Sequence, residues 1–305
     1  MSLPEKCPLC SADQNAQAVV TRHVFGEHQG QAIFRCEHCD IRYLFPGLSE
    51  EDEARLYAAE FEKFMEKRSA SDAGWENPEA HIKANEVEEK RRSHFLSKHL
   101  PPHGRILEVG CSSGFMLHDL SSKGYECVGV EPSGVFSDYV THRGIPCFNS
   151  LEALIENGEH KEGFDVILHY YVMEHIGDPQ TFLRQQLELL KPNGILVFEV
   201  PNATDALSSL YDITAYEKFI WVVSHQWYFS QASMKFLLKD IGVNSEVHMD
   251  QRYDLSNHMT WALDGRPGGM GRFTDVFGAE LEGHYKKSLI KAGMGDTLTV
   301  IIHKK

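Results

Sequence analysis

The 305-residue chain lacks long apolar runs and an excess of basic side chains. No stretch approaches the ~20 consecutive apolar residues of a membrane-spanning helix, so we expect no transmembrane segment. The amino terminus lacks the apolar core of a secretory signal, which predicts a cytoplasmic protein. The 44 acidic residues exceed the 30 basic ones, and the formal net charge is −14. Because nucleic-acid binders usually neutralise phosphates with a basic surface, this balance disfavours nucleic acid as a partner.

Seven cysteines, an odd number, cannot all pair in a disulfide framework within one chain. Four of them form two Cys-x-x-Cys pairs, Cys7 with Cys10 and Cys36 with Cys39, and 25 residues separate the pairs. Tetrahedral Zn2+ is commonly held by four thiolates from two such turns, and a site with four protein ligands leaves no open position for a substrate. The spacing therefore predicts one structural Zn2+ and a reducing compartment.

The pattern divides the chain into a zinc-binding module over residues 1–48, a helical linker over residues 49–100 and a third region over residues 101–305. In the third region apolar β-type runs alternate with helical patterns, which favours a doubly wound, mostly parallel α/β sheet. The expected strands cover residues 106–109, 127–130, 166–169 and 195–199, and the expected helices between them cover residues 115–123, 135–143 and 179–190. A further helix is expected in the linker, over residues 78–100.

Four aromatic residues in the linker allow two interpretations. Their helical spacing fits either a lid over a ligand or ordinary packing in a core. These residues are Tyr57, Phe61, Phe64 and Trp75.

Residues 106–114, Ile-Leu-Glu-Val-Gly-Cys-Ser-Ser-Gly, join an apolar run to a glycine turn. A helical segment follows, and a second apolar run ends at Glu131. This order of strand, glycine turn, helix, strand and acid is that of the nucleotide-binding half of an α/β fold. Gly110 and Gly114 would let the backbone approach a ligand, and Glu131 would accept hydrogen bonds from ribose hydroxyls. The pattern favours an enzyme.

Further motifs follow this turn in a fixed order. They are Gly-Val-Glu-Pro-Ser at 129–133, Phe-Asp-Val-Ile at 164–167, Val-Met-Glu-His-Ile-Gly-Asp-Pro at 172–179 and Leu-Lys-Pro-Asn-Gly at 190–194. Together with the glycine turn, the set resembles class I S-adenosylmethionine-dependent methyltransferases over residues 105–247. A dehydrogenase would not account for the last two motifs. The resemblance implies a Rossmann-like catalytic domain over residues 101–305 and S-adenosylmethionine as the methyl donor.

The resemblance also implies which residues bind the donor. They are Glu108, Gly110, Cys111 and Gly114 around the methionine portion, Glu131 at the ribose, Asn149 and Ser150 near the adenine, and His169 and Tyr170 beside the amino-acid end.

A narrower resemblance concerns the acceptor. A four-cysteine module, a helical linker and this core are similar to methyltransferases of nucleotide-linked deoxysugars, which have a Tyr-x-Glu-His segment shortly before an aromatic Phe-Ser. This chain matches at His225 and at Tyr-Phe-Ser 228–230, but has Ser224 in place of Glu and Val222 in place of Tyr. It also ends before the additional carboxy-terminal domain of the sugar C-methyltransferases. These departures favour an oxygen acceptor on a sugar, a nucleotide-sugar or a related polar metabolite.

Transfer to a hydroxyl requires a base, and histidine titrates near neutral pH. His225 is the first candidate base, and His175 or Glu174 is the second, although any of the 17 histidines could be structural. Three alternatives stay open: a sugar C-methyltransferase, a ribosomal-RNA methyltransferase with a zinc finger, and an inactive donor-binding protein. Residues 1–49 have four basic and five acidic side chains, a net charge of −1, which opposes the RNA alternative. The sequence does not define an oligomeric state.

Overall fold

The computed structural model describes residues 3–26, 30–49, 51–52 and 77–305. The chain divides into two compact units. Unit 1 comprises Met1–Ser49, Met173–Pro179 and Glu199–Val300, and unit 2 comprises Glu50–Val172, Gln180–Phe198 and Ile301–Lys305. The four linker aromatics at positions 57, 61, 64 and 75 lie outside the described residues. Within the described part of the chain, no helix is long and apolar enough to cross a membrane.

Unit 2 is built on a mostly parallel sheet in the order β8-β7-β4-β5-β6. Strand β4 (Arg105–Val109) pairs in parallel with β5 and with β7, and β5 pairs in parallel with β6. The other strands are β5 (Glu126–Val130), β6 (Cys147–Phe148), β7 (Phe164–Tyr170) and β8 (Leu190–Pro201). The predicted α/β sheet is therefore confirmed. The strand order reverses direction between β4 and β7, and ligands of such sheets bind beyond the carboxyl ends of the strands at this switch point.

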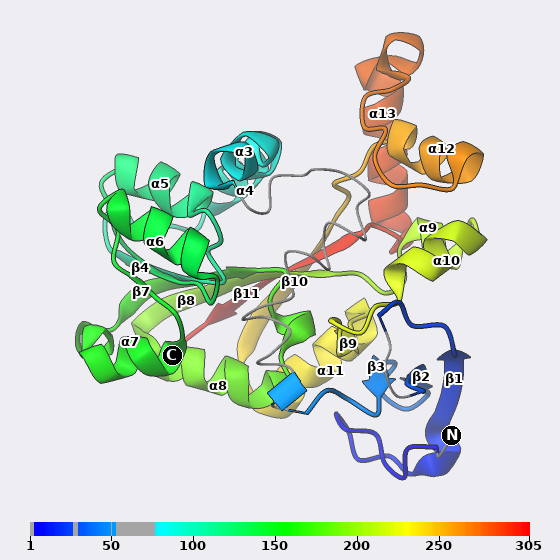
Figure 1. Cartoon of the computed structure of the whole chain (residues 1–305), viewed down its shortest axis with the longest axis horizontal. Coiled ribbons are helices and arrows are strands. Elements are labelled where there is room, and N and C mark those ends of the chain that lie inside the picture. Colours follow the sequence, from blue (N-terminus) through cyan, green and yellow to red (C-terminus); the bar gives the residue numbers. More distant parts are fainter. Residues whose placement is uncertain (1–2, 27–29, 50, 53–76) are drawn as a thin grey trace. The chain divides into compact units, whose positions relative to one another are not determined.

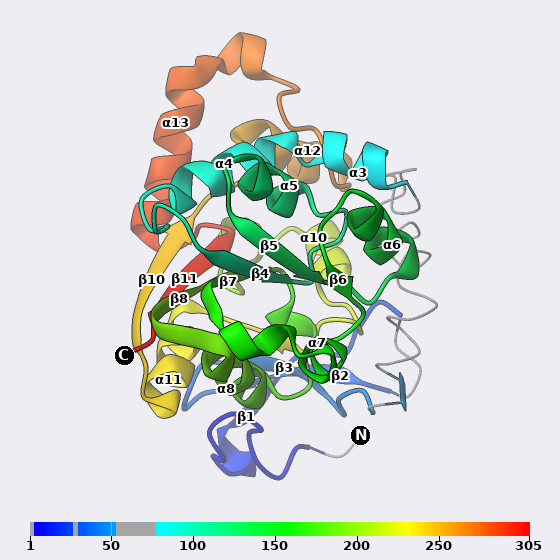
Figure 2. The same ribbon diagram turned by 90° about the vertical axis from the view of Figure 1, so that its left-hand side faces the viewer.

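Helices cover both faces of this sheet (Figures 1 and 2). On one face lie α3 (Pro78–Ala84), α4 (Glu86–Leu96), α5 (Phe115–Ser122) and α6 (Gly134–His142), and on the other lie α7 (Leu151–Asn157) and α8 (Pro179–Leu189). Leu96, Leu117 and Val140 on the first face pack with Ile106 and Leu168 of the sheet.

The helix expected over residues 78–100 is instead two helices that meet at Asn85. Asn77 caps α3 by accepting hydrogen bonds from the backbone N–H groups of Glu79 and Ala80. Asn85 ends this helix with φ −103° and ψ 8°, outside the helical region, and α4 begins at the next residue. The amide side chain of Asn85 donates to the carbonyl of His81 at 2.8 Å, so it competes with the backbone for an acceptor of the helix.

Unit 1 contains a four-stranded sheet in the order β1-β2-β3-β9. Its strands are β1 (Gln17–Thr21), β2 (Ala32–Cys36), β3 (Arg42–Phe45) and β9 (Trp227–Tyr228), and each pairs antiparallel with its neighbour. Phe34 and Tyr43 stack across β2 and β3 with their ring centroids 6.2 Å apart. The amino-terminal sheet is thus completed by a strand from the second half of the chain.

The rest of unit 1 carries helices beside β10 (Asn244–Asp250) and β11 (Thr297–His303). These helices are α9 (Ala206–Ser209), α10 (Thr214–Ile220), α11 (Gln231–Ile241), α12 (Leu255–Asp264) and α13 (Thr274–Ala292). The boundary between the two units falls within β8 and within β11, so each of these strands contributes residues to both units.

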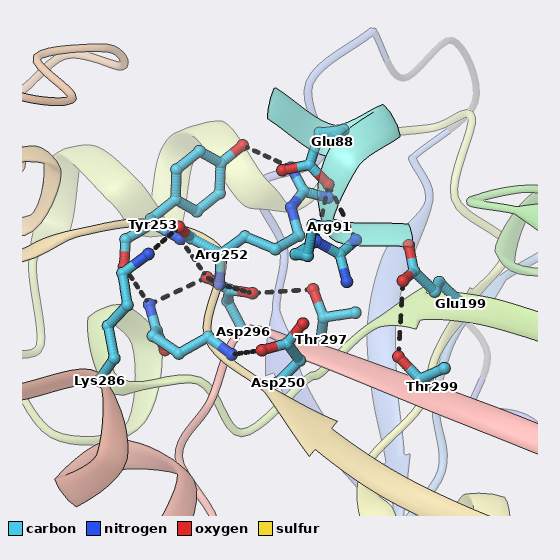
Figure 3. Close-up of polar contacts among 11 residues, drawn as sticks. Glu88, Arg91, Glu199, Asp250, Arg252, Tyr253, Lys286, Asp296, Thr297 and Thr299 are labelled. Atoms are coloured by element: carbon cyan, nitrogen blue, oxygen red, sulfur yellow. Dashed lines mark hydrogen bonds and ion pairs between the residues drawn. The ribbon is translucent and has the colours of Figure 1, made fainter. Parts of the chain in front are cut away.

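A half-buried aspartate, Asp296, fixes the loop that follows β10 (Figure 3). Oδ2 of Asp296 accepts hydrogen bonds from the backbone N–H groups of Arg252 at 3.0 Å and Tyr253 at 2.9 Å. Lys286 of α13 donates to the carbonyl oxygen of Arg252 at 2.6 Å. Burial raises the pKa of Asp296, while the positive charge of Arg252 opposes this shift. These groups join β10, α13 and the start of β11, so we interpret the cluster as structural.

Candidate functional sites

The glycine turn, residues 110–114, follows β4 and leads into α5. Gly110 has φ +73°, and a Cβ there would lie 2.5 Å from Cγ2 of Val172. The N–H groups of Gly110 and Cys111 donate to the carbonyl of Val130 at 2.8 and 3.1 Å. Gly114 has φ +69° and is the N-cap of α5. A side chain is therefore excluded at Gly110, and the helix that follows presents its N-terminus, which favours a polar or anionic ligand group.

The carboxylate of Glu131 joins the glycine turn to the loop after β5. Its Oε2 accepts a hydrogen bond from the N–H of Ser112 at 2.7 Å, and its Oε1 accepts one from the N–H of Ser133 at 2.9 Å. Both loops are therefore held by one side chain. Since each carboxylate oxygen has a second lone pair, this fixed group retains capacity to accept hydrogen bonds from a diol.

Glu108, in β4, is a buried acid on the sheet face that α4 and α5 cover. Its side chain is 3% exposed, and its Oε2 has no hydrogen-bond partner among the described residues. Burial raises the pKa of Glu108 to about 8, against the opposing influence of the positive charge of Arg92. Buried polar atoms in native proteins are normally paired. This acceptor fits the ammonium group of an amino-acid ligand, which would stabilise its charged form.

Two residues that we did not predict from sequence lie beside these groups. Nδ1 of His81 lies 2.9 Å from Oγ of Ser113, and burial lowers the pKa of His81 to about 4, so its imidazole is neutral. The guanidinium carbon of Arg92 lies 3.9 Å from the ring centroid of Tyr170, a cation–π contact. Arg92 is buried and supplies a positive charge on the same side of the sheet as Glu108. That charge suits a ligand carboxylate.

His169 points to the opposite face of the sheet. Successive side chains of a strand alternate in direction, and Tyr170 belongs to the cluster that packs under α4 and α5. The ring of His169 instead stacks on Phe198 at 4.6 Å and meets the edge of Phe182 at 5.3 Å. Burial lowers the pKa of His169 to about 3, so it remains neutral.

The two predicted adenine neighbours lie at the start of α7. Ser150 is its N-cap, and its Oγ accepts a hydrogen bond from the N–H of Ala153 at 3.1 Å. Asn149 is exposed. Of the nine predicted donor residues, the structure therefore groups most at the glycine turn and its flanking strands: Glu108, Gly110, Cys111, Gly114, Glu131 and Tyr170.

The four cysteines of the two Cys-x-x-Cys pairs come together in unit 1. Their sulfur atoms all lie within 4.8 Å of one another, with 3.7 Å between Cys7 and Cys39 and 3.6 Å between Cys10 and Cys36. Four sulfurs about 2.3 Å from a tetrahedral Zn2+ would be about 3.8 Å apart. The observed spacing therefore fits the predicted metal.

The two cysteine turns have the same backbone geometry. The N–H of Ser11 donates to the carbonyl of Cys7 at 2.9 Å, and the N–H of Asp40 donates to that of Cys36 at 2.8 Å. Both donor residues have positive φ, 59° and 63°. Next to the sulfurs, the amide of Gln17 lies 3.8 Å from Sγ of Cys36. Each pair of thiols is thus presented by a tight turn at an end of the β1–β3 sheet.

The three candidate bases also lie together in unit 1. The rings of His175 and His225 meet edge to face with centroids 4.7 Å apart, and the ligand atoms of Glu174 and both histidines lie within 4.8 Å of one another. Nδ1 of His175 lies 2.8 Å from the carbonyl oxygen of Ser224. Because a carbonyl only accepts, Nδ1 carries the proton and Nε2 is the basic nitrogen of His175.

Backbone and amide contacts hold this histidine pair in place. The N–H of Gln226 donates to the carbonyl of Glu174 at 2.8 Å, and its side-chain amide donates to the carbonyl of His175 at 3.0 Å. The indole N–H of Trp227 donates to the carbonyl of Ile176 at 2.8 Å. Trp227 belongs to β9, so the sheet that holds the cysteine turns also positions the segment that contains His225.

Comparison with known proteins identifies a family model and sequence relatives that this chain matches. A family model described as a methyltransferase domain matches residues 81–246. The ubiquinone biosynthesis O-methyltransferase of Azorhizobium caulinodans is 30% identical over 129 residues, which are 40% of this chain and 51% of that protein. The protein of the same name from Cereibacter sphaeroides is 27% identical over 186 residues, 55% of this chain and 70% of its own length. This chain thus spans about half the length of the first of these relatives.

Among solved structures, an S-adenosylmethionine-dependent methyltransferase from Archaeoglobus fulgidus is 18% identical, with a TM-score of 0.46 over 71% of this chain and 94% of the other. The plantazolicin methyltransferase BpumL, solved with S-adenosylhomocysteine, is 17% identical, with a TM-score of 0.46 over 81% and 98% of the two chains.

Proposed function

We propose, since this chain belongs to the family described as a methyltransferase domain, that it methylates a hydroxyl group of a sugar or a related small polar metabolite. Transfer of the methyl group from S-adenosylmethionine and the class of acceptor are both part of this proposal, and the match of residues 81–246 to a methyltransferase domain supports the transfer. The names of the relatives from Azorhizobium and Cereibacter support oxygen as the methylated atom. The sugar rests on the four-cysteine module and on the segment around His225.

The observation on which donor binding rests is the set of groups around the glycine turn. S-adenosylmethionine supplies an activated methyl group when it is bound. Glu131, fixed by two backbone N–H groups, would accept hydrogen bonds from the ribose hydroxyls. Glu108 would hold the ammonium group and Arg92 the carboxylate of the methionine portion. These contacts would orient the donor for in-line displacement, which requires chiefly alignment of the reacting atoms.

The proton of the acceptor hydroxyl needs a base as the new bond forms. We assign this role first to His225, with His175 and Glu174 as its neighbours. The edge-to-face contact supports this assignment, because it holds the ring of His225 against that of His175, whose own orientation is fixed by the carbonyl oxygen of Ser224. A proton taken by one imidazole then has a second imidazole and a carboxylate close by to stabilise the charge.

The four-cysteine site is assigned to one structural Zn2+. All four positions of a tetrahedral ion would be filled by sulfur, so the metal would bind neither donor nor acceptor. Its role would be to fix the β1–β3 sheet on which β9 pairs.

The proposal is tested by a screen of nucleotide-sugars, free sugars and simple phenols for methyl transfer, with NMR to separate oxygen from carbon methylation. We expect oxygen methylation of a sugar-type acceptor. Methylation only at carbon atoms, or only of the phenols, would contradict the proposal of a sugar hydroxyl as the acceptor. Failure of the protein to bind S-adenosylmethionine in calorimetry would refute the enzymatic function itself.

The base is tested separately with His225→Ala and with His284→Ala as a matched control at an exposed histidine. His225→Ala should lower kcat by about 100-fold or more, the usual contribution of a general base, while donor affinity stays unchanged. The control should retain full kcat. Full activity of His225→Ala would exclude His225 as the base.

A further inference from the structure

Cys111 and Cys147 are in contact beside the glycine turn, and the proposed function does not use them as a pair. Sγ of Cys111 lies 3.8 Å from Sγ of Cys147. Cys111 belongs to the turn itself, and Cys147 lies in β6, two strands away from β4. The sulfurs thus connect the turn with the edge of the unit 2 sheet.

A glycine makes room for this contact. Gly129 of β5 lies between the two positions and pairs with Cys147 in the strand register. A Cβ on residue 129 would lie 2.8 Å from Sγ of Cys111 and 3.1 Å from Sγ of Cys147. Any side chain at position 129 would displace the two sulfurs, so their contact requires glycine at this position.

The environment of the two thiols differs in a way that suits oxidation. Cys147 is partly exposed, whereas Cys111 is buried. A hydrogen bond from Cys111 and a weaker one from Ser137 lower the pKa of Cys147, although burial opposes the shift. The thiolate is the reactive form of cysteine, so Cys147 is the accessible nucleophile and Cys111 the neighbour able to resolve its oxidised form.

We propose that Cys111 and Cys147 form an oxidisable dithiol whose disulfide weakens binding of the methyl donor; the effect on the donor rests on the proposed function. With hydrogen peroxide as the oxidant, the Cys147 thiolate attacks a peroxide oxygen, and the O–O bond breaks to give a sulfenic acid and hydroxide. The sulfur of Cys111 then attacks the sulfenic sulfur and displaces the second hydroxide. Two thiols and one peroxide thus give one disulfide and two waters.

The disulfide would displace the donor-binding turn. A disulfide bond is about 2.05 Å long, so the sulfurs must approach by roughly 1.8 Å. Cys147 is held on both sides, because Pro146 accepts from the N–H of Gly129 and Phe148 accepts from the N–H of Glu131, both at 2.8 Å. The backbone of Cys111 is also held, because its N–H donates to the carbonyl of Val130 at 3.1 Å, so closure of the disulfide strains both segments and part of the movement falls on the glycine turn. The next residue, Ser112, donates the 2.7 Å hydrogen bond that fixes Glu131, the proposed ribose ligand.

The test treats the full-length, metal-loaded protein with hydrogen peroxide and measures two things. Peptide mapping should find residues 111 and 147 cross-linked, with a mass loss of about 2 Da. Calorimetry with S-adenosylhomocysteine should show affinity lowered by roughly tenfold, as for loss of one hydrogen bond to a charged group. Dithiothreitol should restore it. Absence of this cross-link, or a cross-link with unchanged affinity, would overturn the proposal.

Two variants exclude oxidation elsewhere. Cys147→Ser keeps the four metal-site cysteines and Cys127, so peroxide should not change its affinity for S-adenosylhomocysteine. An equal loss in this variant would place the effect at another site and overturn the proposal. Cys127→Ser should behave as the wild type does. If the reduced wild type did not bind S-adenosylhomocysteine, the proposed function would fail, while the cross-link would still be decided by its mass.

Discussion

Cysteine sulfurs approach within 4 Å of one another in two regions of the molecule, and the surroundings of the two groups differ. In unit 1, sulfur pairs at 3.6 and 3.7 Å belong to a set of four, which two turns with the same hydrogen-bond pattern present. In unit 2, the pair at 3.8 Å stands alone, with one sulfur on the glycine turn and the other on a strand. Similar distances therefore have different meanings. Four sulfurs complete the ligand set of a metal, whereas two leave a dithiol open to oxidation.

The largest effect is expected from breaking the four-sulfur group. Cys36→Ser removes one ligand of an ion whose apparent binding free energy is about 10–16 kcal/mol in small zinc domains. We expect the variant to lose its metal and the β1–β3 sheet to lose protection in hydrogen exchange. Metal analysis of the wild type should give about one zinc per chain. Cys147→Ser, which removes a sulfur of the two-sulfur group, should keep its zinc. Full zinc content in Cys36→Ser would remove the distinction between the two groups.

The next effect concerns the backbone that presents Cys111. Gly110→Ala places a Cβ 2.5 Å from Val172 at a residue with φ +73°. Overpacking costs about 1–3 kcal/mol and the left-handed conformation about 1–2 kcal/mol, so the free energy of unfolding should fall by about 2–5 kcal/mol. The matched control is Gly124→Ala, where φ is +91° and no atom lies within 4 Å of the added Cβ.

Chemical denaturation measures both variants. The control should lose only the conformational part, about 1–2 kcal/mol. Equal losses in the two variants would show that Val172 does not exclude a side chain from the turn.

The third effect concerns Glu131, whose carboxylate accepts a hydrogen bond from the glycine turn. Glu131→Ala removes the acceptor of two backbone N–H groups and the proposed ribose ligand. Loss of a hydrogen bond to a charged group costs about 1.5–3 kcal/mol, so affinity for S-adenosylhomocysteine should fall by about 10- to 100-fold in calorimetry. Glu152→Ala, at an exposed acid in the first turn of α7, should leave it unchanged. Unchanged affinity in Glu131→Ala would move the ribose contact elsewhere.

The smallest effect is a pH dependence at Glu108. Its pKa of about 8 lies above the ordinary value of 4.5, so at pH 7 the folded protein holds a proton that the unfolded chain has released. The free energy of unfolding should therefore fall as the pH rises between these two values. A donor ammonium favours the carboxylate form, so donor affinity should rise about fivefold from pH 7 to pH 8.

Glu108→Gln should bind more weakly and lose this pH dependence, which calorimetry at the two pH values measures. A pH dependence that persists in Glu108→Gln would assign the titration to another group. Replacing a cysteine of the four-sulfur group should leave this pH dependence of donor affinity unchanged, which distinguishes the two regions by experiment.

Local spacing in the sequence predicted those parts of the molecule that a short segment encodes. The cysteine turns and the glycine turn are such segments, because each is defined by a few consecutive backbone conformations. The break at Asn85 was missed, since it depends on one amide that competes for a backbone acceptor. Strand alternation would have placed His169 opposite Tyr170, had its period been extended through β7.

Other parts depend on contacts between distant segments and left no local signal. Arg92 lies beside Arg91 on the same helix, and only packing against Tyr170 separates a buried cation from a surface one. The pairing of β9 with β3, which positions the segment of His225, joins residues far apart in the chain. The contact of Cys111 with Cys147 likewise appears only once β5 and β6 are aligned.

The close approach of Val172 to Gly110 also constrains how this sequence can diverge. A change to alanine at position 110 is tolerated more easily if a smaller residue already occupies position 172, whereas the reverse order passes through a poorly folded intermediate. The two sites should therefore drift together among descendants of this chain, with glycine at 110 persisting wherever a branched residue is kept at 172. We therefore expect one methyl group of Val172 to couple the substitutions that positions 110 and 172 tolerate, although no local motif connects them.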